Sequence, residues 1–290
     1  MSAQSIINQF FLGLSTASIY VLVSLGLTMI FGMMNVLNFT HGVLYALGAY
    51  FSYLLVKLTG SFWWALAIAP LVVALIGVLV EHISIRPLAD RPHLIQFLAT
   101  FALALVIEQI IRLVAGNDAY AVSLPAAFAQ TVNLGPFVIP SYRLFLIFAA
   151  LLVCLGIGTL LAKTQVGALI RAASEDPEMA ALLRVNTRAV STMVFAGGSA
   201  LAALAGALAA PIFSVHPSMG EELITVAFLV VTAGGLGSLR GTILAAIILS
   251  EASSLGLLAV GKYSDVLTIC IMAAVFLVWP AGIFGRAEGR

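Results

Sequence analysis

The chain has 290 residues, of which 62% are hydrophobic and only 9% are charged. Soluble domains are roughly 45–50% apolar and about 25% charged, so a water-soluble fold could not bury this much apolar surface. The 13 Lys and Arg residues nearly balance the 12 Asp and Glu residues, which excludes a basic nucleic-acid-binding surface and an acidic solvated tail. The composition therefore predicts an all-α integral membrane protein.

Apolar runs between polar breaks predict a polytopic bundle of about 8–9 transmembrane helices, since roughly 20 apolar residues cross a bilayer core as a helix. The predicted spans are residues 8–31, 36–56, 62–80, 94–115, 142–162, 189–212, 222–238, 243–260 and 265–284. We expect some of them to be broken or re-entrant, and the whole chain to form one transmembrane domain. Cys154 and Cys270 fall in separate spans, where we expect both to pack in the core.

The distribution of Lys and Arg predicts the orientation, because cytoplasmic loops accumulate these residues. One alternating assignment puts nine on one side: Arg86, Arg91, Lys163, Arg171, Arg184, Arg188, Arg240, Arg286 and Arg290. It leaves four on the other: Lys57, Arg112, Arg143 and Lys262. The long connection 163–188 and the C-terminus are therefore expected in the cytoplasm. The long connection 116–141 and the N-terminus are expected outside.

A polar break interrupts the apolar sequence between Gly32 and Gly42. It contains Asn35, Asn38, Thr40 and His41. Polar groups at membrane depth must face protein or a watery cavity, so these residues are candidates for a translocation pathway or hinge, together with Gly42. The alternative is a short cytoplasmic turn capped by asparagine. We expect His41 to form a structural hydrogen bond rather than to bind a metal, because no second ligand lies at helical spacing.

A comparable break in the second half of the chain is rich in glycine. It contains Gly234, Gly235, Gly237, Ser238 and Gly241. Broken segments in both halves are typical of transport pathways, and Ser238 can cap the helix that follows. The run 197–210 has small residues at repeated i, i+4 spacing, which predicts close helix packing.

Two carboxylates fall inside predicted spans, where an ionised group is costly. Glu108 precedes Arg112 at the i, i+4 spacing that favours an ion pair. Glu251 has only serines near it in the sequence, so it faces the pathway, faces a partner subunit or is protonated. An interface or conformational role is our preferred interpretation.

The hydrophilic connection 163–188 contains a short amphipathic helix that begins near Pro177. Acidic residues precede it, and Met179, Leu182 and Leu183 form an apolar stripe at i, i+3, i+4 spacing. Such a helix is suited to docking in a groove of another protein. The alternative is a helix that lies on the membrane or on its own bundle.

Four motifs occur in the order of a known family. They are NVLNFTHGVLYALGAY, GALIRAASEDPEMAALLRVNT, GGLGSLRG and VWPAGIFGR. Their order resembles the LivH-type permeases, the membrane subunits of branched-chain amino-acid ABC importers. The resemblance implies a multi-pass protein of the bacterial cytoplasmic (inner) membrane that translocates hydrophobic amino acids. It also implies three kinds of partner: a second, LivM-like permease, two ATPase subunits and a periplasmic substrate-binding protein.

By this resemblance the cytoplasmic helix couples transport to the ATPases. The matching positions are Glu175, Asp176, Met179, Ala180, Leu183, Arg184 and Asn186. Two positions depart from the family pattern: Arg184 stands where glycine is usual, and TILAA follows GGLGSLRG where more glycine is common. The alternatives within the family are a urea, amide, aromatic or small carboxylate substrate. An ion-coupled carrier that uses Glu251 and Glu108 is the alternative outside it.

The sequence predicts no catalytic residue, metal ligand or cofactor. The segment GLLAVGKY at 256–263 has glycines and Lys262 at P-loop spacing, but Tyr263 replaces the magnesium-binding Ser or Thr and no strand precedes it. Neither a nucleophile beside a base nor a metal-ligand cluster is apparent. ATP hydrolysis is therefore expected in partner subunits.

Overall fold

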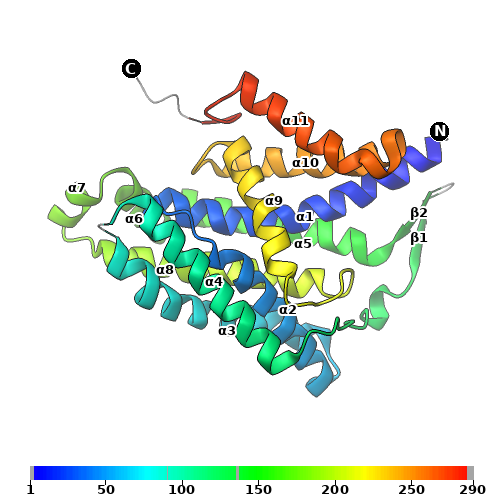
Figure 1. The fold of residues 1–290 in the computed structure, drawn as a ribbon, viewed down its shortest axis with the longest axis horizontal. Helices are drawn as coiled ribbons and strands as arrows, with labels where there is room; N and C mark the ends of the chain where they lie inside the picture. The colour runs from blue at the N-terminus through cyan, green and yellow to red at the C-terminus, as the bar shows by residue number, and fades with distance from the viewer. Residues whose placement is uncertain (1–2, 90, 135–136, 286–290) are drawn as a thin grey trace.

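The computed structural model describes residues 3–89, 91–134 and 137–285, and these ranges are almost entirely helical (Figure 1). The helices of the bundle are α1 (Ala3–Met34), α2 (Thr40–Thr59), α3 (Phe62–Val80), α4 (His93–Ala115), α5 (Ser141–Lys163), α8 (Thr187–Ala209), α9 (Met219–Gly234), α10 (Leu239–Val260) and α11 (Ser264–Val278). The connection between α5 and α8 forms two more, α6 (Gln165–Glu175) and α7 (Pro177–Leu182).

Each predicted span coincides with one helix of this bundle. Seven helices in the described ranges are long and apolar enough to cross a membrane, whereas α9 and α11 have 16 and 15 residues. The prediction placed the end of the last span at residue 284, but α11 ends at Val278. Trp279 precedes Pro280, and a proline disfavours helical backbone at the residue before it, because its ring would clash with that residue.

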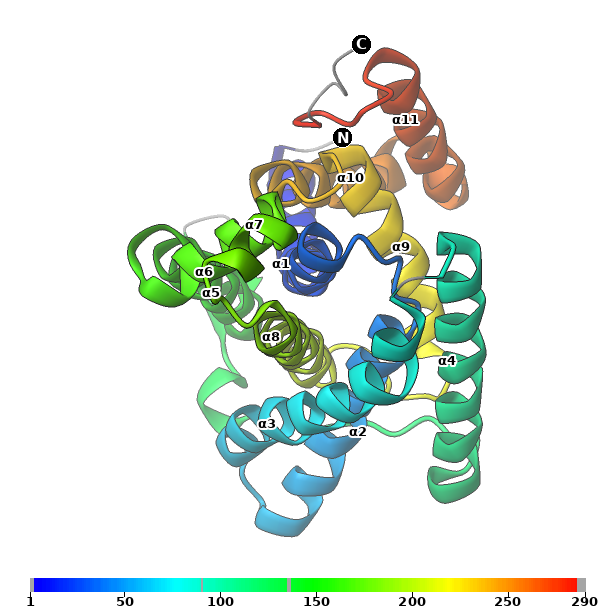
Figure 2. The ribbon, with the colours of Figure 1, turned by 90° about the vertical axis from the view of Figure 1, so that its left-hand side faces the viewer.

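Connections gather at two opposite ends of the bundle, which lie left and right in Figure 1. We call one the arginine-rich end; it contains residues 35–39, 81–89, 91–92, 164–186, 235–238 and 279–285. The other is the hairpin end, with residues 60–61, 116–134, 137–140, 210–218 and 261–263. Helix α3 continues into the arginine-rich end as a π-helical turn, η1 (Glu81–Ile85), and a 3₁₀ turn, η2 (Arg86–Leu88). Figure 2 looks onto this end, with α6 and α7 toward the viewer.

The long connection 116–141 contains structure that the sequence analysis did not predict. A 3₁₀ turn, η3 (Ala126–Phe128), precedes the antiparallel pair β1 (Thr131–Leu134) and β2 (Phe137–Pro140), in which Thr131 opposes Pro140. Tyr120 and Val215 also exchange two backbone hydrogen bonds of 2.9 and 2.8 Å. The connection is thereby fixed to the turn between α8 and α9.

Glycine contacts hold the centre of the bundle, where α8 packs against α1 and α2. A Cβ added at Gly48 of α2 would overlap the backbone of Ala203, and one at Gly206 would overlap the carbonyl of Tyr45. A Cβ added at Gly26 of α1 would lie 2.7 Å from the carbonyl oxygen of Gly198. Close approach at small residues stabilises helix pairs in lipid by packing. The close packing predicted for 197–210 is confirmed.

The two cysteines differ in their surroundings. Cys154 is partly buried on α5, but Cys270 is exposed on α11. The predicted core position of Cys270 is therefore wrong. Helix α11 packs mainly on α10, so only one face of it is covered by the chain, and Cys270 lies off that face.

Candidate translocation site and coupling arm

The first polar break is a short, partly buried turn between α1 and α2, with Asn35 exposed and Asn38 buried. Asn35 adopts left-handed backbone with φ of 52°, a conformation that asparagine tolerates better than most residues. The Asn38 side-chain oxygen accepts hydrogen bonds from the Thr40 amide at 3.1 Å and the Thr40 hydroxyl at 2.5 Å. Asn38 and Thr40 are fully buried. Asn38 thus fixes the start of α2 by a local turn, and its side chain and that of Thr40 face the protein interior.

His41 connects α2 to the middle of α1. Its Nε2 lies 2.9 Å from the carbonyl oxygen of Val23, and since a carbonyl only accepts, the imidazole donates through Nε2. The ring packs against Gly26, where an added Cβ would lie 2.9 Å from Cε1. In the described part of the chain, no group of three His, Cys, Asp or Glu side chains is placed to hold a metal. The predicted structural hydrogen bond of His41 is confirmed.

Gly42, the last residue of the first break, lies against α9. A Cβ at Gly42 would overlap the carbonyl oxygen of Gly220, and one at Gly220 would meet the backbone of Gly42. The pair holds the starts of α2 and α9 in backbone contact. A bulkier side chain at either glycine would separate the two helices.

The second break forms the tight turn that the glycines predict. Gly235 and Gly237 have φ of 99° and 81°, which other residues rarely adopt. The Ser238 hydroxyl accepts a hydrogen bond from the Gly241 amide at 3.2 Å, so the predicted cap of α10 is confirmed. Gly234 and Gly241 are in backbone contact across the turn.

The two breaks meet at the arginine-rich end. A Cβ added at Gly32, the last glycine of α1, would lie 3.5 Å from the Cα of Gly237. The last turn of α1, at the edge of the first break, therefore meets the turn between α9 and α10, about 200 residues away in the sequence.

A hollow opens at the hairpin end, among α1, α2, α9 and the turn that precedes α9. It encloses about 830 Å³ of empty space, including space open to the surroundings. Four of its lining residues are polar aromatic or titratable: Tyr20, Tyr45, His216 and Glu222. His216 Nε2 lies 3.8 Å from a Glu222 carboxylate oxygen. The sequence analysis missed these residues, because they come from three helices and a turn and form no local motif.

Each intramembrane carboxylate has a place within the chain. Arg112 donates to Glu108 at 2.6 Å, which confirms the predicted pair. Glu251 faces α1, where an added Cβ at Gly13 would lie 2.8 Å from its carboxylate. Neither carboxylate oxygen of Glu251 has a hydrogen-bond partner among the described residues. The neighbouring Ser250 hydroxyl donates to the carbonyl of Gly13 at 2.8 Å.

The connection between α5 and α8 is an ordered arm built from α6 and α7, which we call the coupling arm (residues 164–186). A side-chain cap starts each of its helices and the helix that follows. Thr164 accepts from Gly167 at 3.1 Å, Asp176 from Met179 at 2.9 Å and Asn186 from Ala189 at 3.1 Å. Each cap satisfies an amide that the first helical turn leaves unpaired.

The apolar stripe of the coupling arm points away from the bundle. Met179, Leu182 and Leu183 are 54%, 78% and 73% exposed, whereas Ala180 is buried and anchors α7. The alternative in which this stripe packs on its own bundle is therefore wrong, whereas the alternative in which the helix lies on the membrane stays open. Glu175 is exposed beside it. Arg184 has φ of 63°, so this arginine occupies a left-handed position that favours glycine.

These features define a multi-pass membrane protein whose two broken segments meet and whose arm lies beyond its spans. The family model for the branched-chain amino acid transport system permease component matches residues 9–276, and the chain belongs to this family. It is a transmembrane permease subunit of the ABC-transporter type and not an enzyme.

Curated relatives are similar over nearly the full chain. LivH, the high-affinity branched-chain amino acid transport permease of Escherichia coli K12, is 29% identical over 97% of this chain and 96% of its own length. BraD of Pseudomonas aeruginosa is also 29% identical, over the same shares. A probable LivH of Methanocaldococcus jannaschii is 28% identical over 93% of this chain and 89% of its own length. No solved structure matches the chain.

Proposed function

We propose that this chain is the permease subunit of an ATP-driven importer of branched-chain, hydrophobic amino acids. The observation that carries the proposal is the exposed apolar stripe of the coupling arm, formed by Met179, Leu182 and Leu183. Three exposed apolar side chains on a capped helix suit a groove in a partner protein. In an ABC transporter that partner is the ATPase, of which we expect two copies.

The residues of the coupling arm divide by what they contact. Met179, Leu182 and Leu183 would enter the ATPase groove, with Glu175 at its rim. Asp176 and Asn186 act through the helices that they cap, and Ala180 fixes α7 to its neighbours. Arg184 sets the turn that leads into α8.

We place the arginine-rich end in the cytoplasm of a bacterial cell, with the hairpin end outside the inner membrane. Nine Lys and Arg residues against four support this orientation, as counted from the sequence. It puts the coupling arm beside the ATPases and the hairpin end beside a periplasmic substrate-binding protein. A second, LivM-like permease would cover part of the apolar surface that α4 and α5 expose.

The hollow at the hairpin end offers complementary chemistry for an amino acid. The Glu222 carboxylate can receive the ammonium group, and the Tyr20 and Tyr45 hydroxyls lie on the same lining. Ile19, Leu223 and Val226 supply an apolar wall for a branched side chain. We propose this hollow as the outer entrance of the pathway, and the junction of Gly32 and Gly237 as its hinge at the opposite end.

An ion-coupled carrier is the second candidate function, since Glu108 and Glu251 lie within spans. Glu108 pairs with Arg112, whereas the Glu251 carboxylate lies against Gly13 without a hydrogen-bond partner among the described residues. The ion pair favours a structural role for Glu108, and for Glu251 we propose an interface or conformational role rather than proton transport. Urea, amides and aromatic or small carboxylates remain alternative substrates within the family.

Substrate uptake by proteoliposomes tests the proposal. The chain is reconstituted with its partner permease, the ATPases and the binding protein, and labelled leucine is offered beside urea and benzoate. We expect leucine uptake only when ATP is supplied on the side of the membrane where the ATPases lie. Uptake by the isolated chain under an ion gradient alone would contradict the proposal.

Two neighbouring glutamates provide a matched test of the hollow. Glu222→Gln should reduce leucine uptake about tenfold, since it removes the charge that receives the ammonium group. Glu221→Gln is the control, because Glu221 does not line the hollow. Equal loss in both variants would remove the hollow from the pathway while leaving the ATP-driven function intact.

A further inference from the structure

A second hollow lies at the arginine-rich end, between the end of α3 and the start of α8. It holds about 1000 Å³ of empty space, including space open to the surroundings. Three cationic or titratable side chains line it, His82, Arg86 and Arg188, together with Val78, Asn186, Ala189, Thr192, Met193 and Ala196. We call it the α3–α8 groove. It lies on the opposite end of the bundle from the amino-acid hollow.

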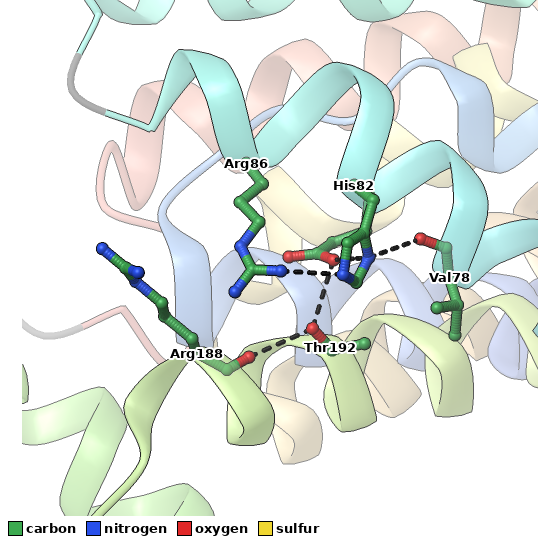
Figure 3. A network of polar contacts seen from close by, with 6 residues as sticks. Val78, His82, Arg86, Arg188 and Thr192 are labelled. Carbon is green, nitrogen blue, oxygen red and sulfur yellow. Dashed lines mark hydrogen bonds and ion pairs between the residues drawn. The ribbon is translucent and has the colours of Figure 1, made fainter.

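Hydrogen bonds fix one wall of the groove (Figure 3). Arg86 donates to His82 Nε2 at 2.7 Å, and His82 Nδ1 lies 3.0 Å from the carbonyl of Val78. A guanidinium only donates, so Nε2 accepts and Nδ1 carries the proton. His82 thereby orients Arg86 at the edge of the groove.

The acidic group near the groove is turned inward. Glu81 is buried, and its carboxylate accepts from the Thr192 hydroxyl at 3.1 Å and lies 2.9 Å from His82 Nδ1. These contacts join η1 to α8 across the base of the groove. Arg86 and Arg188 outnumber this one buried carboxylate, so the accessible side of the groove is positive.

Arg188 is available to an incoming anion. Its guanidinium makes no hydrogen bond or ion pair within the ranges that the structure describes, and it is exposed. It belongs to the first turn of α8, whose amide dipoles also favour negative charge. Figure 3 shows Arg86 and Arg188 extending from the two facing helices.

The groove changes from charged to apolar along α8. Its charged part begins at Asn186 and Arg188, and its apolar part is formed by Val78, Met193 and Ala196. At about 1.5 Å per residue, Ala196 lies roughly 15 Å along α8 from Asn186. That depth is about half of a hydrocarbon core. Both walls belong to apolar helices long enough to cross a membrane.

We propose that the α3–α8 groove binds an anionic phospholipid, with its phosphate between Arg86 and Arg188 and an acyl chain along Val78, Met193 and Ala196. A basic rim above an apolar channel matches both parts of a lipid, and basic sites between membrane helices bind such head groups. A soluble ATPase would not reach the apolar part at membrane depth. A free phosphate ion would leave that part uncovered.

Native mass spectrometry of the purified full-length chain tests the proposal. The protein is exchanged into mixed micelles that contain phosphatidylglycerol and phosphatidylcholine. We expect retained phosphatidylglycerol to fall about fivefold in Arg86→Gln or Arg188→Gln and about 25-fold in the double variant. Arg240→Gln is the control, since Arg240 is exposed at the same end but outside the groove. An equal fall in Arg240→Gln would overturn the site.

A variant that fills the apolar part of the groove distinguishes lipid binding from the binding of other anions. Ala196→Phe leaves both arginines in place and should expel the lipid, while thermal unfolding of the variant confirms a folded chain. Retention of phosphatidylglycerol by Ala196→Phe would contradict the acyl-chain position. The proposal would be overturned if the chain bound inorganic phosphate but retained no lipid. It would also be overturned if Arg86→Gln/Arg188→Gln lost association with the ATPase and still retained the lipid.

Discussion

Helices α5 and α8, which the coupling arm joins, differ in how far the chain itself covers them. In an apolar stretch of 18 residues, 61% of the residues are buried in α8 and 11% in α5. Helix α8 fits between α1 and α2 through Gly198 and Gly206. Glycines on α5, at Gly156 and Gly158, have open space where a Cβ would be.

The coupling arm therefore joins a tightly packed helix to a loosely packed one. One end of the arm is attached to a helix that the bundle holds tightly, and the other to a helix whose contacts lipid or a partner must complete. Under the proposed function, a displacement of α7 would be passed to α8, and through the backbone contacts of α8 to α1 and α2. Helix α1 carries Gly32, whose contact with Gly237 forms the junction.

The largest effect should come from filling a glycine contact of α8. In Gly206→Leu the side chain would overlap the Tyr45 carbonyl and approach the Ala49 amide. We expect the free energy of unfolding to fall by about 3 kcal/mol or more, since overpacking a tight core forces backbone shifts. The yield of folded protein and its thermal unfolding in detergent measure this effect.

Gly156→Leu on α5 is the matched control. The substitution is chemically the same, but an added Cβ has no described atom within 4 Å. Thermal unfolding should change little. Equal destabilisation of the two variants would remove the distinction between α5 and α8.

The next effect concerns the exposed stripe of the coupling arm. Leu182→Asp/Leu183→Asp places charges where the ATPase groove would be apolar, and we expect substrate-stimulated ATP hydrolysis to fall at least tenfold. Because both side chains are exposed, thermal unfolding of the permease should stay within about 0.5 kcal/mol. Unchanged stimulation would exclude this stripe from coupling.

Reversing a charge on the coupling arm should have a smaller effect. At Asp176 the effect of the charge must be distinguished from the effect of losing the helix cap. Glu175→Lys should reduce stimulated ATP hydrolysis about threefold without a change in stability. Asp176→Lys should in addition lose the cap on Met179, at a cost of about 1 kcal/mol. Asp176→Asn removes the charge and keeps the cap, so equal stability of Asp176→Lys and Asp176→Asn would contradict the capping role.

The smallest effect should come from Arg184, where the arm turns into α8. Its left-handed backbone costs about 1 kcal/mol in a non-glycine residue. Arg184→Gly should raise stability by a few tenths of a kcal/mol, since greater unfolded-state freedom offsets part of the gain. Arg184→Ala keeps the strain and is the control. Chemical denaturation of both variants distinguishes the effects.

Hydropathy and small-residue patterns predicted much of this fold. The apolar runs located each bundle helix, and local spacing predicted the pair of Glu108 with Arg112, the Ser238 cap and the close packing of 197–210. Each of these depends on residues that are neighbours in the sequence. Local physical chemistry was therefore sufficient.

Contacts between distant segments could not be predicted in the same way. Glu81 and Thr192 are 111 residues apart, and nothing in either segment indicates the other. The hollow that combines Tyr20, Tyr45 and Glu222 has the same origin. The strands at 131–140 were missed because the surrounding Ala and Pro residues are typical of an irregular loop.

The location of the coupling arm tests the account most directly. In a chain with Cys154 and Cys270 replaced by alanine, Leu182→Cys places a single thiol on the exposed stripe, and Ala119→Cys places one at the hairpin end. With a membrane-impermeant maleimide, intact cells should label only Ala119→Cys, and inverted vesicles only Leu182→Cys. Labelling of Leu182→Cys from outside intact cells would contradict the account.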